Sequence, residues 1–584
     1  MLRSKTEDIL RRAVRSRWGE EAAADLRVEP PREKSHGDFA ANAAMVLAKG
    51  LRRKPRELAE ELKTDLEASG FFRSVEIAGP GFLNLKLRPA ALHDLLGHIL
   101  EEGERYGRSE PERALRRQIE FVSANPTGPL NVVSARAAAV GDTLARLFEA
   151  TGHAVDREFY VNDAGSQVDH LVDTVLWYLE GKAGDFPGEG YRGAYVEELS
   201  EEARAIFEPR FPRSPEGLGA ERIGPAASAL LSRLGSSPAG GDSALPDPCP
   251  IDDAAHRLLL RLWTLEKMLA AQRADLEKFG VRFDRWFRES ELHAEGAVEA
   301  ALADLERAGD VYEKDGARWF RSSAYVDDED RVVIRSNGAP TYFLADVAYH
   351  RDKKNRGYDH AIDILGPDHH GHVPRMQSAL LALGAPENWL EVMIVQQVNL
   401  LRGGETVKMS KRAGEFVSLR ELIEEVGADA ARFFFLMLRP NSHLNFDLDL
   451  AKSRSLDNPV YYVQYAHARI CSVFRHAEAA GVAPAAGESA EDRTGVDREE
   501  EFDILRMLDA FPDVIALAAA TREPHRLPTY LKEVAAAFHG YYHKVQVVTE
   551  DAKSTAARLA LLRAIRLVLR NGLDLIGVHA PESM

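Results

Sequence analysis

Between Gln118 and Val161 the chain passes from a strand-like apolar run to a helical period and back. Gln118–Val122 is a mostly apolar run without a breaker, and it predicts a buried strand. Apolar residues recur at helical spacing from 137 to 147, which predicts a helix that begins near the N-cap residue Ser134 and ends at Gly152. Arg157–Val161 is the next predicted strand. This order is typical of the first crossover of a doubly wound parallel sheet.

The loop inside this unit, residues 125–129, is a dense cluster of turn residues, Asn-Pro-Thr-Gly-Pro. It leads into the predicted helix, whose first backbone N–H groups and positive dipole end are suited to phosphate. A βαβ unit without any ligand has the same pattern, so this stretch alone leaves both interpretations open.

The strand pattern continues beyond an insertion rich in glycine and proline. Residues 181–250 predict a surface insertion with a helix at Val196–Phe207, and a further helix is predicted at Ile251–Phe279. Asp315 and Gly316 predict a hairpin turn. The sheet is then predicted to resume with three apolar runs, Thr341–His350, Ala361–Leu365 and Met393–Leu401. Loops at the carboxyl ends of such strands are where ligands bind.

The first 110 residues predict a small α/β unit. Helices are predicted at Thr6–Trp18 and at His36–Gly50, where a Lys-Gly pair ends the second helix. Phe71–Leu87 alternates around a Gly-Pro-Gly turn and predicts two strands. This unit precedes the doubly wound core.

From about Asn458 the pattern is purely helical and predicts a separate domain. A low-complexity linker at 477–500 is followed by two or three amphipathic helices between Phe502 and Leu575. Basic residues lie near four tyrosines, and this combination suits single-stranded RNA. The tyrosines are Tyr461, Tyr462, Tyr541 and Tyr542. A solvated helix surface explains the same residues equally well.

Composition and charge narrow the class of protein. The chain has 584 residues, enough for several domains, and 75 Lys+Arg against 92 Asp+Glu give a net charge of −17. This balance argues against a polybasic nucleic-acid binder but allows local basic patches. Cys249 and Cys471 lie too far apart in the sequence for a CxxC zinc site, and two cysteines cannot form a disulfide framework. Without an apolar stretch of 18 residues or an N-terminal apolar segment, a cytoplasmic protein with no membrane contact is expected.

The most specific short motif is KMSK at Lys408–Lys411, which follows the turn at Gly403 and Gly404. Two lysines on a loop that begins at a glycine turn suit the triphosphate of ATP, because they can neutralise charge as pyrophosphate leaves. A lone KMSK occurs by chance. Its position after the last strand of a doubly wound sheet makes the ATP interpretation much more specific.

With these motifs the chain resembles class I aminoacyl-tRNA synthetases, and specifically the bacterial arginyl-tRNA synthetases. The resemblance covers almost the whole chain. The segments that carry it are HGDFAANAAMVLAK, EFVSANPTGPL, REFYVNDAGSQ, TYFLADVAYHRDK, GPDHHGHVPRM, KMSKRAGEFVSLRELIEEVGADAARFFFL, NPVYYVQYAHARI and LIGVHAPESM.

The resemblance implies an α/β fold: a doubly wound parallel sheet with a Rossmann-like class I core, a small N-terminal α/β domain and a C-terminal all-α bundle. Residues 1–110 would bind tRNA, 111–457 would be catalytic with an insertion around 181–250, and 458–584 would bind the anticodon. The implied reaction ligates L-arginine to its tRNA through arginyl-adenylate and releases AMP and pyrophosphate. ATP accompanied by Mg²⁺ is the implied co-substrate, and a monomer is expected.

The resemblance also assigns roles to single residues. The catalytic set is Lys408, Lys411, Asn131 and Ser134. The arginine-binding set is Glu120, Ser123, Asn125, Tyr342, Asp346 and His370. The ATP-binding set is Pro126, Gly128, Val133, Asp368, His369, Val398, Met409 and Ser410. A planar guanidinium is held best by a carboxylate, which suits Asp346, although an acid in an apolar run is also commonly a structural cap or a buried ion pair.

Two features leave alternatives open. The histidines of Asp368–His372 could suggest zinc, but a fourth ligand at standard spacing is missing, and no metal site is expected. The family's first phosphate motif is usually His-x-Gly-His, whereas residues 131–134 read Asn-Val-Val-Ser. Arg136 could supply compensating charge. A catalytically silent paralogue that binds tRNA or senses arginine is therefore the alternative to an active enzyme.

Overall fold

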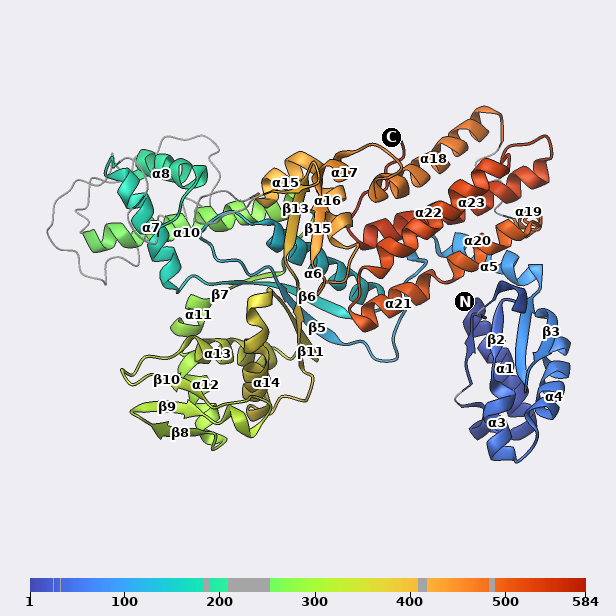
Figure 1. Ribbon diagram of the computed structural model, residues 1–584, viewed down its shortest axis with the longest axis horizontal. Coiled ribbons are helices and arrows are strands. Elements are labelled where there is room, and N and C mark those ends of the chain that lie inside the picture. The colour runs from blue at the N-terminus through green and yellow to red at the C-terminus, as the bar shows by residue number, and fades with distance from the viewer. Residues whose placement is uncertain are drawn as a thin grey trace.

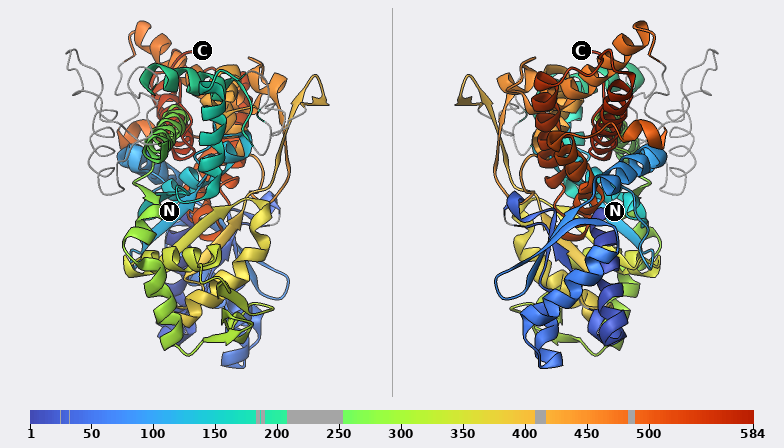
Figure 2. Two further views of the ribbon diagram at one scale, coloured as in Figure 1. Left: turned by 90° about the vertical axis from the view of Figure 1, so that its left-hand side faces the viewer. Right: turned by 90° about the vertical axis from the view of Figure 1, so that its right-hand side faces the viewer.

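The computed structural model describes residues 1–24, 26–31, 33–182, 186, 190–207, 253–407, 417–482 and 489–584. Figure 1 shows a central sheet with a small N-terminal unit and a helical bundle on one side and two further groups of elements on the other. Figure 2 shows the same arrangement from both ends, with the red C-terminal helices above and the blue N-terminal unit below. KMSK and most of the predicted 181–250 insertion lie outside the described residues.

The central sheet is parallel, with strand order β12-β11-β5-β6-β7. Its strands are β5 (Arg116–Phe121), β6 (Ala154–Val161), β7 (Arg285–Arg288), β11 (His360–Leu365) and β12 (Leu390–Ile394). The chain starts in the middle, adds strands on one side, and then returns to add the others beside β5. The predicted doubly wound sheet is therefore confirmed, and its switch point lies between β5 and β11.

Helix α6 (Val132–Ala150) follows β5 and is buried along most of its length. Small residues let it approach the sheet closely: a Cβ on Gly141 would lie 2.3 Å from the Phe121 ring. The predicted N-cap at Ser134 is wrong. Asn131 caps the helix, because its backbone is extended and its Oδ1 accepts hydrogen bonds from the N–H groups of Val133 (3.0 Å) and Ser134 (2.9 Å).

Two of the apolar runs predicted as strands differ in the structure. Thr341–His350 lies in helix α13 (Tyr342–Asn355), where Thr341 is the N-cap and Phe343, Leu344, Val347 and Ala348 form one buried face. Met393–Leu401 is divided between β12 and β13 (Val398–Arg402). Strand β13 leaves the central sheet and pairs with β14 (Glu405–Thr406) and β15 (Leu444–Asp447).

The predicted helix after the central insertion and the predicted hairpin are both confirmed. Helices α7 (Ser166–Leu179), α8 (Ala194–Phe207) and α10 (Asp253–Lys278) share a hydrophobic core of their own, and we call them the helical arm. Beyond the arm, β8 (Val311–Lys314), β9 (Ala317–Phe320) and β10 (Arg331–Ile334) form an antiparallel sheet. It packs with α11 (Glu289–Ala294), α12 (Ala297–Arg307), α13 and α14 (Val373–Ala382) around a further core.

The N-terminal unit has a sheet of order β1-β2-β4-β3. Its elements are α1 (Leu2–Trp18), α2 (Glu20–Ala23), β1 (Val28–Glu29), β2 (Phe39–Ala41), α3 (Ala43–Leu51), α4 (Pro55–Ala68), β3 (Phe72–Ala78), β4 (Phe82–Leu87) and α5 (Pro89–Glu102). The predicted helix at His36–Gly50 is thus partly wrong, because residues 39–41 pair with β4 and the helix ends at the left-handed Arg52 rather than at Gly50.

In the described part of the C-terminal bundle, four helices of eleven or more residues follow α18 (Pro459–Ala479), rather than the predicted two or three. They are α20 (Glu499–Asp509), α21 (Phe511–Thr521), α22 (Arg526–Lys544) and α23 (Ala552–Leu575), and the short α19 (Ala490–Arg493) precedes them. Helices α15 (Leu419–Val426), α16 (Ala428–Phe435) and α17 (Leu448–Lys452) connect core and bundle. Among the described residues, no helix is both long and apolar enough to span a bilayer.

Candidate active site

A buried lysine joins the two strands at the switch point. Glu120 and Asp363 are register neighbours on β5 and β11, and the Lys353 ammonium donates to Glu120 Oε2 at 2.6 Å and to Asp363 Oδ1 at 2.7 Å. Lys353 is fully buried, and these two carboxylates raise its pKa despite the desolvation that opposes it. His350 contacts the second oxygen of Asp363 at 2.7 Å. Because every charge here has a partner, the network forms a rigid base for the site.

The chain turns sharply where β5 ends. Val122 and Ser123 have φ angles of 71° and 38°, a left-handed conformation that is strained for residues with side chains. The turn brings the Ser123 hydroxyl to Glu120 Oε1, to which it donates at 2.8 Å, while the same hydroxyl accepts from the Tyr160 N–H at 3.1 Å. Glu120 and Ser123, both predicted to contact arginine, are therefore already bonded to each other.

Beside this base lies a group of carboxylates that carries excess negative charge. Asp346 on α13 is one helical turn after Tyr342, which is 63% exposed, so both lie on one face of the helix. Although 36% of the Asp346 side chain is exposed, desolvation by the surrounding protein raises its pKa to about 7; His350 opposes this shift, and the nearby carboxylates, Glu289 first among them, add to it. Burial also raises the pKa of Glu289, which accepts a hydrogen bond from Tyr160. We call Asp346 and Glu289 the acid pair.

The acid pair has little positive charge around it. Of the described side chains, only His372 comes within ion-pair distance of Asp346, at 3.4 Å. Burial lowers the pKa of His372 to about 4, so it is neutral at physiological pH. Glu289 in turn has His293 at 3.9 Å, so the ion-pair partners of both carboxylates among the described side chains are histidines. Two carboxylates that are costly to ionise and have only histidines beside them favour a cationic ligand.

The loop at 125–128 closes the site next to the start of α6. Asn125 is exposed and donates from Nδ2 to Gln167 at 2.7 Å, while Pro126 is buried. Gly128 allows a close approach, since a Cβ there would lie 3.2 Å from the Tyr195 hydroxyl. Downstream, the Leu419 N–H donates to the Leu130 carbonyl at 2.7 Å. The residues that follow KMSK in the sequence therefore return to the start of α6.

The start of α6 offers less to a phosphate than its sequence position implies. Asn131 Oδ1 already occupies the N–H groups of Val133 and Ser134, and Asn131 also bridges to Ser418. The hypothesis that Arg136 supplies charge here is wrong. Its side chain is fully buried and donates to three backbone carbonyls, and burial lowers its pKa to about 10.

The remaining predicted residues are spread around the same edge. Asp368 and His369 are exposed on the 3₁₀ helix η5 (Pro367–His372), and the side chain of His370 lies outside the described residues. Val398 is buried on β13 and so offers only its backbone to a ligand. Met409 and Ser410 lie with KMSK outside the described residues. Among the side chains that the structure describes, no group of three or more His, Cys, Asp or Glu is arranged to hold a metal ion.

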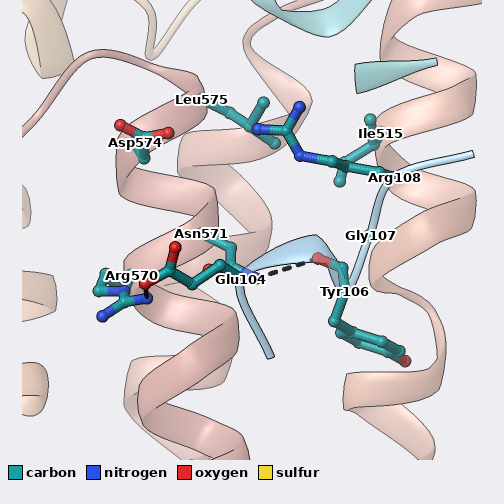
Figure 3. A pocket seen from close by; sticks show the side chains of 9 residues that line it. All are labelled: Glu104, Tyr106, Gly107, Arg108, Ile515, Arg570, Asn571, Asp574 and Leu575. Atoms are coloured by element: carbon teal, nitrogen blue, oxygen red, sulfur yellow. Dashed lines mark hydrogen bonds and ion pairs between the residues drawn. The ribbon is translucent and has the colours of Figure 1, made fainter. Parts of the chain in front are cut away.

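A separate cavity of about 270 Å³ lies where residues 104–108 meet α21 and α23. Figure 3 shows Arg570 paired with Glu104, and Asn571 donating to the Tyr106 carbonyl at 3.1 Å across this junction. These bonds join the N-terminal unit to the bundle. The acid pair and the strand ends do not line this cavity.

The doubly wound sheet, the ligand-type loop at its switch point and the acid pair fit a class I aminoacyl-tRNA synthetase, and the comparisons with known proteins show that the chain belongs to this class. Arginine–tRNA ligases are similar to the chain over nearly its whole length. That of Halorhodospira halophila is 50% identical and covers 96% of this chain and 95% of its own, and that of Thioalkalivibrio sulfidiphilus is 47% identical over 97% and 96%. The chain belongs to the arginine–tRNA ligase family.

Matches to single domains agree with this assignment. Residues 4–87 match the arginyl tRNA synthetase N terminal domain, and residues 463–584 match the DALR anticodon binding domain. The arginyl-tRNA synthetase of Thermus thermophilus has a similar fold, with a TM-score of 0.73 over the whole of both chains at 24% identity.

Sequence reasoning missed several residues of the site. Glu289, Tyr160 and Lys353 lie far apart in the sequence, and no short motif connects them. Lys353 carried the best available signal, because a lysine that lies seven residues after Asp346 shares its face of a helix. A strand at Thr341–His350, as predicted, would not place these two residues on one face, so the signal appears only in the helix.

Proposed function

We propose that this chain ligates L-arginine to its cognate tRNA with ATP, through an arginyl-adenylate, and releases AMP and pyrophosphate. The observation that carries the proposal is the acid pair, whose carboxylates have raised pKa values and little positive charge near them. A guanidinium is planar and always charged, so it supplies the missing cation and can pair with both carboxylates. Tyr342, exposed one turn before Asp346, is placed to cover it.

In this proposal the arginine-binding set is Glu120, Ser123, Asn125, Tyr342, Asp346 and His370, together with Glu289 and Tyr160. Glu120 and Ser123 act as a pre-bonded pair whose remaining lone pairs face the substrate amine. Attack of the arginine carboxylate on the α-phosphate of ATP forms a C–O–P linkage and expels pyrophosphate. The terminal ribose hydroxyl of tRNA then attacks the activated carbonyl and expels AMP.

The ATP-binding and catalytic roles are proposed for the residues at the start of α6, on η5 and in KMSK. They are Pro126, Gly128, Asn131, Val133, Ser134, Asp368, His369, Val398, Lys408, Met409, Ser410 and Lys411. Lys408 and Lys411 bring charge to the β- and γ-phosphates, and Mg²⁺ arrives with ATP as part of the substrate. Asn131 keeps its Nδ2 as a donor, because its Oδ1 caps the helix.

We also propose that residues 1–110 and 458–584 bind tRNA and that 111–457 are catalytic, in a cytoplasmic monomer. A platform on the bundle supports anticodon binding: the rings of Tyr461 and Tyr465 stack at 6.0 Å and 9°, and His539 lies 5.8 Å from Tyr465. Arg469 lies over the Tyr542 ring. Such rings and guanidinium groups stack on unpaired bases. Tyr541, included in the predicted RNA surface, is buried and bonded to Glu501.

The test is arginine-dependent charging of total tRNA by the purified protein. Charging with arginine and not with lysine is expected, because an ammonium cannot form the forked pair. Equal charging with lysine would contradict the arginine assignment. If the wild type forms no arginyl-adenylate even with tRNA present, the silent-paralogue alternative, favoured only by the Asn-Val-Val-Ser sequence at 131–134, replaces it.

A further inference from the structure

The helical arm holds the loop at 125–128 through one side chain from each of its three helices. Gln167 on α7 accepts from Asn125 Nδ2 at 2.7 Å. Tyr195 on α8 donates its hydroxyl to the Thr127 carbonyl at 3.0 Å. Gln272 on α10 donates from Nε2 to two carbonyls of the same loop. In Figure 1 these helices form a group that extends from the central sheet, so the loop is where the arm reaches the site.

Of these three side chains, Gln272 makes two hydrogen bonds to the loop, and each of the others makes one. Gln272 is 1% exposed, and its Nε2 donates to the Asn125 carbonyl at 3.1 Å and to the Gly128 carbonyl at 2.9 Å. The amide orientation follows from chemistry, because the opposite orientation would place its oxygen against two carbonyl oxygens. Its Oε1 accepts no hydrogen bond from the described residues. Both N–H groups of this amide are therefore committed to fixing the two ends of one four-residue loop.

The same face of α10 also contacts the helix that follows KMSK in the sequence. Asp275, three residues after Gln272, is 2% exposed and accepts from Arg420 Nε at 2.9 Å. Arg420 lies in the first turn of α15, whose first residue, Leu419, donates to the carbonyl of Leu130. Helix α10 thus contacts both the loop before α6 and the helix that is bonded to that loop.

We propose that Gln272 and Tyr195 are positioning residues that fix the loop at 125–128 for the adenylation step, an inference that rests on the proposed function. Three of the four loop carbonyls, those of Asn125, Thr127 and Gly128, are bonded on the arm side. The peptide groups therefore cannot rotate without breaking buried hydrogen bonds, and the opposite side of the loop stays directed at the substrates. Neither side chain touches the reacting atoms in this proposal.

The variants are Gln272→Met, which keeps length and volume but cannot donate, Tyr195→Phe, and the double variant. Glu277→Met, at an exposed position on the same helix, is the matched control. Arginyl-adenylate formation measured with tRNA present is expected to lose about tenfold in kcat for Gln272→Met and about threefold for Tyr195→Phe, with the KM for tRNA unchanged. The double variant should fall short of the product of the two losses, because both side chains hold the same loop.

Hydrogen exchange of the peptide that covers residues 122–131 provides a readout that does not depend on activity. Exchange in Gln272→Met is expected to be at least about tenfold faster than in the wild type, with no change in Glu277→Met. Unchanged exchange, or wild-type kcat in both single variants, would overturn the inference. If Gln272→Met does not fold, Tyr195→Phe, which removes one oxygen, decides by the same two measurements. An inactive wild type with faster exchange in the variants would contradict the proposed function but not the role of the arm.

Discussion

Arginine binding is expected to weaken as the pH falls below 7, because Asp346 must lose its proton to pair with the guanidinium. Burial and the neighbouring carboxylates raise the pKa of Asp346 to about 7 in the free protein. The dissociation constant then scales as 1 + 10^(7 − pH), which is about 1.1 at pH 8 and about 11 at pH 6. A rise of about tenfold in Kd is expected between these values. Burial raises the pKa of Glu289 in the same direction.

The sign of the linked effect on stability is opposite. A carboxyl whose pKa is raised in the folded state contributes stability that is complete below its unfolded pKa, 3.8, and is lost as the pH rises through about 7. Ionised Asp346 therefore destabilises the arginine-free protein at pH 8, and arginine offsets this cost. Asp346→Asn should raise the stability of the free protein at pH 8 while weakening arginine binding by about 30-fold or more, the equivalent of about 2–4 kcal/mol.

Calorimetric titration of arginine without ATP, in buffers of different ionisation enthalpy, measures both the affinity and the protons released on binding. Proton release is expected near pH 6 and should vanish in Asp346→Asn, whose weaker affinity should also lose most of its pH dependence. A Kd that stays within twofold between pH 6 and pH 8 would refute the reasoning. An unchanged affinity in Asp346→Asn would show that this carboxylate is structural.

Three further predictions concern charge and capping around the site. Lys353→Met should destabilise the protein by about 3–5 kcal/mol, measured by denaturant unfolding, because Glu120 and Asp363 would be left buried without a cation; a smaller effect than 1 kcal/mol would contradict the rigid base. Asn131→Ala should slow adenylate formation and lower the free energy of unfolding by about 1 kcal/mol, because the helix cap is lost. Asn131→Ser should slow adenylate formation without this loss of stability, because Ser can also cap the helix. Lys408→Ala and Lys411→Ala should lower kcat for adenylate formation with little change in arginine affinity, and a defect confined to arginine KM would place KMSK away from ATP.

The crossover from β5 through α6 to β6 was predictable because the spacing of its apolar residues changes from strand-like to helical and back. Turn residues at 125–129 and Gly152 mark the two changes. Within this crossover, the helix start was not predictable, since Asn131 and Ser134 are equally good N-caps and only the backbone conformation decides between them. The strand predicted at Thr341–His350 was wrong for a different reason. The run contains aromatic and β-branched residues, which favour a strand, but Thr341 caps a helix there and the apolar positions fit one helical face. Tertiary packing against the β8–β10 unit settles such a choice.

The residues of the site were predictable from the sequence only where they lie together in one short motif. Asp346 and Tyr342 lie four residues apart on one helix, so one stretch contains both. Glu289 lies near Asp346 from the start of α11, and its partner Tyr160 comes from the end of β6. Their meeting depends on the order of strands in the sheet. No local pattern in the sequence contains that information.

The structure changes how the sequence at 131–134 bears on activity. With Asn131 Oδ1 bonded to the N–H groups of Val133 and Ser134, a phosphate that approached the start of α6 would compete with a bond already made. Arg136, directed into the protein, cannot compensate. The helix dipole and Asn131 Nδ2 remain, and both are weaker than a charged donor. In the proposed reaction, neutralisation of the departing pyrophosphate therefore falls mainly to Lys408, Lys411 and the Mg²⁺ that arrives with ATP, so activity should depend on these lysines more steeply than in relatives with two histidines in this motif.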